Sequence, residues 1–174
     1  VLKTIRSRSL AAARAATEPV SGATFARFLP EWHSIAPAGK RPVLRGADGV
    51  FSVIEQLAGV RLPASAWESL ILPARVGDYS PTMLDELTSN GEVLIVGAGK
   101  AGAADPWIML LPSDYAAQLA PETDAEGVSM VQRSILDVLG RGGGFLFADI
   151  AAEAPGSTEE TREALWGLVE MGLV

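Results

Sequence analysis

The feature that most constrains the fold is a single change of hydrophobic period within residues 48–111. Apolar residues first recur at three- and four-residue spacing, as in Val50, Ile54 and Leu57, which is typical of a helix with one buried face. Two short apolar runs then follow, separated by a glycine-rich stretch, which is typical of a β-hairpin. The expected helices cover residues 48–57, 64–72 and 81–89, and the expected strands cover residues 92–96 and 107–111. Three helices followed by a hairpin is the order of a winged helix, a helix-turn-helix variant.

Local signals support these boundaries. Asp48 is a suitable N-cap for the first helix, and Gly59 follows as its C-cap. Ser80 precedes Pro81, which places proline at the first position of the third helix. We expect Met83, Leu84 and Leu87 to face inward from that helix, and Asn90-Gly91 to end it.

A second unit repeats the order after Pro121. A helix is expected over residues 125–139, a short strand over residues 144–147 and a short helix over residues 148–153. Ser157, with Glu160 three residues later, predicts a capping box for a last helix over residues 158–171. Gly172 would end that helix, and Leu173-Val174 would start a strand, so this copy stops before its wing.

The predicted fold class is therefore mainly α (α+β), with tandem winged-helix modules preceded by a helical segment. The expected divisions are a basic lead-in at residues 1–45, a winged helix at 46–120 and a second, truncated one at 121–174. In the lead-in, helices are expected over residues 3–17 and 22–29, the second with an apolar face made by Phe25, Phe28 and Leu29. Residues 30–42, with three prolines, read as a connector. Both ends of the sequence are expected to be cuts through a larger protein.

Charge is distributed unevenly along the chain. Residues 1–45 hold eight basic and two acidic residues, for a net charge of +6, whereas residues 46–174 hold six basic and nineteen acidic residues, for -13. Phosphate contacts are thus expected at the basic end. The candidate nucleic-acid-binding residues are Arg6, Arg8, Arg14, Lys40, Arg41 and Arg45, with Lys100 in the expected wing. For the three arginines of the first helix, a solvated helix face is an equal alternative.

Composition excludes several kinds of site. The chain has no cysteine, which excludes disulfides and cysteine-ligated zinc or iron–sulfur centres, and its single histidine excludes a multi-histidine metal site. No apolar run is long enough for a membrane span.

Asp85 and Glu86 lie on the expected exposed side of the third helix, where their negative charge would repel phosphate. We predict no catalytic residue: His33 lies in the proline-rich connector and no G-x-S-x-G motif is present. Trp67, Trp107 and Trp166 are expected in the core.

One glycine motif resembles a dinucleotide site. Gly97, Gly99 and Gly102 form a literal G-x-G-x-x-G after the first expected strand. A dinucleotide fold needs a helix to begin inside the motif so that its N-terminus holds the pyrophosphate. Here Asp105-Pro106 and an apolar strand follow instead, so we interpret the motif as a hairpin loop.

Several segments resemble the C-terminal region of the Lhr (large helicase-related) proteins of bacteria. They include LPASAWESLILPARV, YSPTMLDELTSNGEV, EPVSGATFARFLPEWHSI and LWGLVEMGLV, and the similarity covers nearly the whole chain. The Ala/Arg-rich composition is similar to that of actinobacterial members.

The resemblance implies a cytoplasmic, nucleoid-associated parent protein. Lhr proteins are superfamily-2, ATP-dependent helicases that move 3′ to 5′ on single-stranded DNA, unwind duplexes including RNA:DNA hybrids, and are linked to DNA repair. ATP and Mg²⁺ would bind the N-terminal motor, whose motifs are absent here, and this segment would need no cofactor. It would be a non-catalytic accessory segment serving DNA binding, oligomerisation or both, in contact with other modules of the same chain.

Two alternatives to a DNA-binding segment remain open at the level of sequence. The acidic winged units suit a module used only for protein–protein contact or homo-oligomerisation. The resemblance also extends to winged-helix DNA glycosylases, so the segment could be part of such a unit, although no glycosylase catalytic residue maps onto it.

Overall fold

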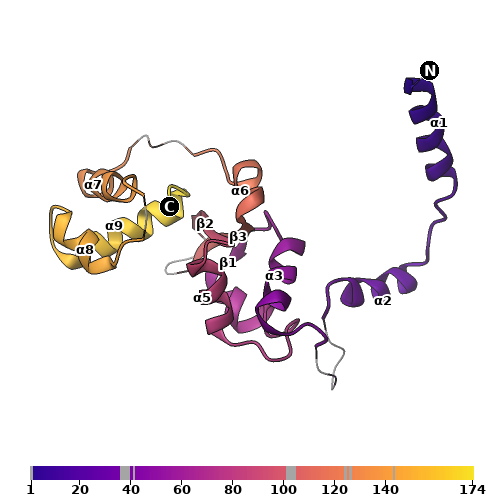
Figure 1. Cartoon of the computed structure of the whole chain (residues 1–174), viewed down its shortest axis with the longest axis horizontal. Helices are drawn as coiled ribbons and strands as arrows, with labels where there is room; N and C mark the ends of the chain where they lie inside the picture. Colours follow the sequence, from indigo (N-terminus) through magenta and orange to yellow (C-terminus); the bar gives the residue numbers. More distant parts are fainter. Residues whose placement is uncertain are drawn as a thin grey trace.

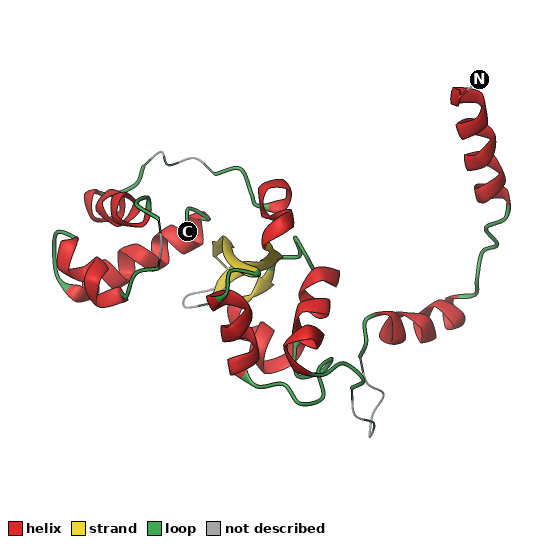
Figure 2. Ribbon diagram, in the orientation of Figure 1, coloured by secondary structure: helices red, strands yellow, loops and turns green. Residues whose placement is uncertain are grey.

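Two helices at the N-terminus lie apart from the main body of the protein, which contains a small sheet and the remaining helices (Figures 1 and 2). The helices are α1 (Leu2–Ala15) and α2 (Gly22–Trp32). The computed structural model describes residues 2–35, 40, 42–100, 105–123, 125, 127–142 and 144–174. Within these ranges, no helix is both long enough and apolar enough to cross a membrane.

The helical lead-in is close to expectation, with one difference. α1 and the start of α2 match the predicted helices, and Ser21 caps α2 by accepting a hydrogen bond from the Thr24 N–H (3.2 Å). However, α2 continues through Pro30 to Trp32, into the predicted connector. A proline inside a helix removes the hydrogen bond of its own N–H and crowds the carbonyl four residues earlier, but Pro30 is the ninth of eleven residues, so only the last turn is affected.

The first unit has the predicted winged-helix order. Its elements are α3 (Gly46–Gln56), β1 (Leu62–Pro63), α4 (Ala64–Ala66), η1 (Trp67–Ile71), α5 (Pro81–Ser89), β2 (Val93–Lys100) and β3 (Pro106–Pro112). The strands form an antiparallel sheet in the order β1-β3-β2, in which Ile95 faces Leu110 across the β2–β3 pair. The hairpin is therefore completed by a short third strand contributed from before α4.

The core of this unit lies between the helices and one face of the sheet. Val50, Ile54, Trp67 and Leu110 are each at most 1% exposed and belong to one apolar cluster. Leu84 and Leu87 of α5 also face this cluster, as predicted, while Met83 is half-buried at its edge. Trp67 is thus a core residue, in agreement with the sequence.

Three boundaries in the first unit differ from prediction. α3 begins at Gly46, so Asp48 lies in its first turn and is not the N-cap. The physical reason is a distant contact: the Gly46 N–H donates to the Asp78 carboxylate (3.1 Å). The second helix is divided into α4 and the π-helical turn η1, where the Leu72 N–H reaches the Trp67 carbonyl (2.9 Å). β2 continues to Lys100 instead of ending at residue 96.

In the described part of the second unit, three helices follow a connecting helix. The connecting helix α6 (Ser113–Leu119) was not predicted, and α7 (Met130–Leu139), α8 (Phe147–Glu153) and α9 (Thr158–Met171) follow it. Ile135, Val138 and Leu168, each at most 1% exposed, form a separate core with Ile150 and Ala154.

Several expectations for the second unit were wrong. α7 begins at Met130 rather than residue 125, because Ser129 and Gln132 form a capping box there. No strand is found among the described residues of 144–147, and Phe147 already begins α8. Trp166 is 53% exposed, so it is not a core residue, while Trp107 is half-buried. Leu173 and Val174 form no strand within the described chain, although the Val174 carbonyl accepts a hydrogen bond from the Gly97 N–H (3.4 Å).

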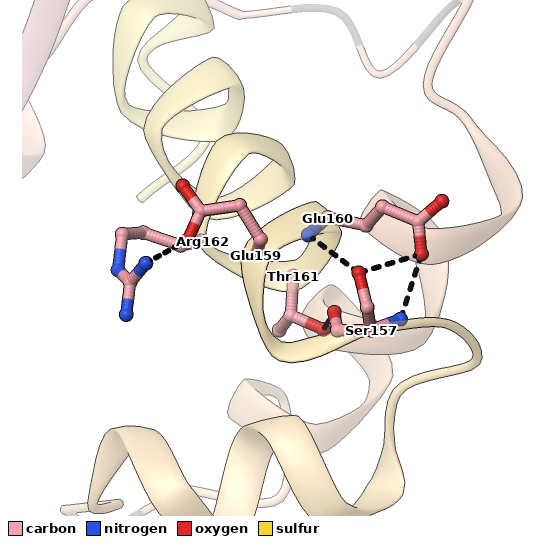
Figure 3. Close-up of polar contacts among 5 residues, drawn as sticks. All are labelled: Ser157, Glu159, Glu160, Thr161 and Arg162. Atoms are coloured by element: carbon pink, nitrogen blue, oxygen red, sulfur yellow. Dashed lines mark hydrogen bonds and ion pairs between the residues drawn. The ribbon is translucent and has the colours of Figure 1, made fainter.

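The start of α9 is the predicted capping box (Figure 3). The Glu160 N–H donates to the Ser157 hydroxyl oxygen (3.2 Å), and the Ser157 N–H donates to the Glu160 carboxylate (2.7 Å). Arg162 forms an ion pair with Glu159 one turn away. Gly172, in the left-handed conformation (φ 72°), ends the helix as predicted.

The two units are packed together through α9 and β2. The C-terminal half of α9 lies against β2, and Val169 packs on the core of the first unit. Residues 46–112 and 130–174 are therefore joined by direct packing as well as by the chain between them.

Candidate nucleic-acid interface

The helix that would enter a DNA groove in a winged helix is acidic in this protein. That helix is α5, the third of the unit, and it contains no lysine or arginine. Its exposed side carries Asp85 and Glu86, as the sequence predicted. Two carboxylates at this position repel phosphate, so α5 is poorly suited to read a groove.

The wing offers one candidate cation, and that cation is paired. The ammonium of Lys100 at the end of β2 lies 3.7 Å from the carboxylate of Glu170 in α9. The Lys100 side chain is 61% exposed and that of Glu170 is 30% exposed. A phosphate contact by Lys100 would therefore compete with an acidic neighbour.

Basic side chains gather on one face of α1. Lys3, Arg6 and Arg14 line the same shallow depression with Leu10, as their three-, four- and eight-residue spacing requires. Arg8 is absent from this lining and lies on another side of the helix. All four cationic side chains are exposed. The structure thus places Arg6 and Arg14 on one face of α1 and Arg8 on another. Lys3 shares the face of Arg6 and Arg14, and its helical spacing from Arg6 could have shown this from the sequence.

The remaining candidates lie elsewhere. Lys40 and Arg45 are exposed near the start of α3, where Arg45 is the N-cap residue. Arg41 lies outside the described residues. Figure 1 shows α1 at one end of the molecule, well apart from β2. The six predicted residues that the structure describes therefore belong to separate surfaces rather than to one site.

One glycine of the motif, Gly97, serves packing between the units. Gly97 lies within β2, and a Cβ placed there would overlap the carbonyl oxygen of Val169 in α9. Gly102 lies outside the described residues. The strand β3 begins at Pro106, only four residues later, which leaves no room for the long helix of a dinucleotide site. The requirement for glycine at residue 97 thus has a structural cause that involves no nucleotide.

The shifted titrating groups also have structural causes. The Ser65 N–H and hydroxyl donate to Asp105 (3.0 and 2.7 Å) and lower the pKa of its carboxyl group. Burial raises the pKa of the Tyr79 hydroxyl, with a further contribution from the Glu68 carboxylate. Burial also lowers the pKa of Arg75, whose guanidinium donates to the Ile71 carbonyl (3.0 Å).

His33, the one histidine, ends α2, where its backbone N–H donates to the Leu29 carbonyl (3.0 Å). Over the part of the chain that the structure describes, no group of three or more histidine, aspartate or glutamate side chains is arranged to hold a metal ion.

Comparison with known proteins decides the family. The model for the winged-helix domain of the large helicase-related protein matches residues 20–113, which include α2 and the whole first unit. This chain belongs to the Lhr family. It is a winged-helix segment of the kind found in Lhr-type helicases, as the resemblance implied, and its domain boundaries at residues 45 and 120 stay predictions.

Two Lhr relatives match the chain along its full length. One, from Mycolicibacterium smegmatis, is called an Lhr helicase and probable uracil glycosylase and is 44% identical over 180 residues. The other, from Escherichia coli, is called an Lhr helicase and uracil glycosylase and is 43% identical over 192 residues. The chain spans 11% and 12% of the length of these two relatives.

The Lhr segment also presents an exposed apolar surface on α2. Phe25, Phe28 and Trp32 of α2 are 50%, 46% and 59% exposed. The sequence predicted an apolar face made by Phe25, Phe28 and Leu29, whereas Trp32 was placed in the connector, and no signal showed that the face would be left uncovered by the described residues.

Proposed function

We propose that this chain is a non-catalytic accessory segment of an ATP-dependent, 3′ to 5′ DNA helicase of the Lhr type, and that it contacts nucleic acid through α1. The observation that carries this assignment is the contrast between α1 and α5. Lys3, Arg6 and Arg14 share one exposed face of α1, whereas the exposed side of α5 carries Asp85 and Glu86. The basic face of α1 attracts phosphate groups, and the acidic side of α5 repels them.

The remaining elements of this proposal come from the family. ATP and Mg²⁺ would bind a motor elsewhere in the parent protein, and the segment itself would need no cofactor. The nucleic acid would be single-stranded DNA or an RNA:DNA hybrid, and the parent protein would act in DNA repair. The relatives' names include uracil glycosylase, but we assign no residue of this chain to that chemistry.

The test is the salt dependence of single-stranded DNA binding by the full-length parent protein. Replacing both Arg6 and Arg14 with alanine should weaken binding and reduce the slope of log affinity against log salt. On a single strand, the slope should fall by about 0.7 for each phosphate that the variant no longer neutralises.

The matched control removes the same charge elsewhere. Arg8 and Arg133 are exposed, and Arg133 lies on α7, so the Arg8→Ala/Arg133→Ala protein should keep the slope. Equal slopes for the Arg6→Ala/Arg14→Ala protein and the unmodified protein would refute the α1 assignment.

A second role, in oligomerisation, is supported by the exposed acidic side of α5. A winged helix whose third helix is poorly suited to bind DNA can use that surface for contact with another subunit. Light scattering of the parent protein tests this role, and a monomer at micromolar concentration would contradict it.

A further inference from the structure

α2 carries a continuous aromatic stripe that no part of the described chain covers. Phe25, Phe28 and Trp32 recur at three- and four-residue spacing and therefore share one face of the helix. The ring centroids of Phe25 and Phe28 are 6.5 Å apart, and those of Phe28 and Trp32 are 5.5 Å apart. Contiguous exposed apolar surface of this kind marks an interaction site in a folded protein.

The stripe lies on a formed helix whose C-terminal end is hydrogen-bonded to the first unit. Ser21 caps the helix at its start, and the Gln56 side-chain amide donates to the Trp32 carbonyl oxygen (2.7 Å) at its end. Since Gln56 is the last residue of α3, this hydrogen bond ties the end of α2 to the winged helix. α2 thereby lies beside the unit, between α3 and α1 (Figure 1).

The composition of the stripe indicates a protein partner. Val20 and Ile35, which are 63% and 37% exposed, flank α2 at its two ends. Aliphatic side chains have no ring face on which a nucleic-acid base could stack, whereas they pack well in an apolar protein surface. The surrounding charge is mixed on α2, which carries Arg27 and Glu31, and basic on α1, which carries Lys3, Arg6 and Arg14. A complementary surface would be apolar with acidic residues at its border.

We propose that the α2 stripe docks on an apolar, acid-bordered surface of another module of the same Lhr-type polypeptide, outside residues 1–174. Two observations support this occupant. The family model begins at residue 20 and so includes α2 in the winged-helix domain, and the chain spans only 11% and 12% of the relatives' lengths. The inference rests on the proposed function, because it requires the segment to be part of a larger protein.

The test is photo-crosslinking in the full-length parent protein. The photoreactive amino acid p-benzoylphenylalanine replaces Phe28, and crosslinked peptides are identified by mass spectrometry after irradiation, with and without single-stranded DNA. The control places the same probe at Leu70, which is 62% exposed in η1. We expect Phe28 to crosslink within one polypeptide to a peptide outside residues 1–174, and Leu70 not to reach that peptide.

Other results would overturn the proposal. A crosslink only to a second polypeptide, seen as doubled mass, would identify the stripe as a subunit contact. A crosslink only to DNA would identify it as a base-stacking surface, and no crosslink would mean that the stripe is open to solvent. Adding Phe25→Asp on the same face should reduce the expected crosslink severalfold, and an unchanged yield would also overturn the proposal. The salt-slope measurement on Arg6 and Arg14 is independent, so failure of the α1 assignment is distinguished from failure of this docking.

Discussion

Gly97 of β2 and Val169 of α9 meet backbone to backbone. A Cβ at Gly97 would lie 2.6 Å from the carbonyl carbon of Val169 and 3.0 Å from its Cα. The contact is reinforced nearby, because the Gly97 N–H donates to the Val174 carbonyl (3.4 Å) and Lys100 pairs with Glu170. The absence of a side chain at residue 97 is therefore what allows the two units to pack this closely.

We predict that Gly97→Val separates α9 from β2. The obstructing atoms belong to the backbone of a helix, so they cannot move aside as a flexible side chain could. Overpacking of this kind costs about 1–3 kcal/mol in the free energy of unfolding. Chemical denaturation of the 174-residue chain should show the decrease in stability, and hydrogen exchange should show faster exchange in α9.

Gly144→Val is the control for this prediction. A Cβ at Gly144 would meet no heavy atom within 4 Å, and Gly144 is exposed. We expect its stability to remain close to that of the unmodified chain. If the two substitutions destabilise the chain equally, the contact with Val169 is not the cause.

The N-cap of α9 yields a second prediction. Ser157→Ala removes the hydroxyl oxygen that accepts from the Glu160 N–H, and removal of such a cap costs about 0.5–2 kcal/mol. Ser52→Ala is a suitable comparison, because the Ser52 hydroxyl donates to the Asp48 carbonyl within α3 and caps no helix. Urea denaturation should show a lower midpoint for the first protein only, and equal midpoints would contradict a capping role.

The same cap should depend on pH. Hydrogen bonds from the Ser157 N–H and hydroxyl lower the pKa of Glu160 below its ordinary value of 4.5. A carboxyl group with a lowered folded-state pKa stabilises the fold above its unfolded-state pKa, and this stabilisation is lost as pH falls through the folded-state value. The stability difference between the unmodified chain and Glu160→Gln should thus shrink between about pH 7 and about pH 3.5. A difference that stays constant over this interval would contradict the assignment.

The acidic side of α5 yields a fourth prediction. Replacing Asp85 and Glu86 with lysine should increase the affinity of the chain for duplex DNA and make it more sensitive to salt, since this helix is placed to face a groove. Asp137 and Glu163 are exposed acids on α7 and α9, and replacing that pair with lysine changes the net charge equally. Fluorescence anisotropy at two salt concentrations compares the variants. An equal gain for both pairs would show that net charge, and not position, determines binding.

Local sequence signals predicted the first and last residues of a helix correctly where residues of that helix itself determine its ends. α5 and α9 begin and end at the predicted residues, because Pro81 fixes the start of one and the Ser157–Glu160 capping box fixes the start of the other. The order of three helices and a hairpin in the first unit followed from apolar spacing, whereas the short strand β1 was not predicted.

Contacts between distant residues explain most of the errors. Asp78 moves the start of α3, and the glycines of β2 read as a loop although α9 packing keeps Gly97 in a strand. The basic residues of the candidate site were identified by charge, but their division among α1, the start of α3 and the wing depends on tertiary structure. Trp166 was expected in a core but is exposed. Helical spacing shows which residues share a face, but it does not show whether another element packs on that face.

The position of β2 has a consequence for solubility. In the order β1-β3-β2 it is an edge strand, and such a strand presents unpaired backbone groups on which other molecules can add strands. The end of α9 and the Val174 carbonyl cover part of this edge at Gly97. The second unit thus shields the first from intermolecular strand addition, and a shortened chain ending at residue 120 should aggregate more readily than the chain of 174 residues.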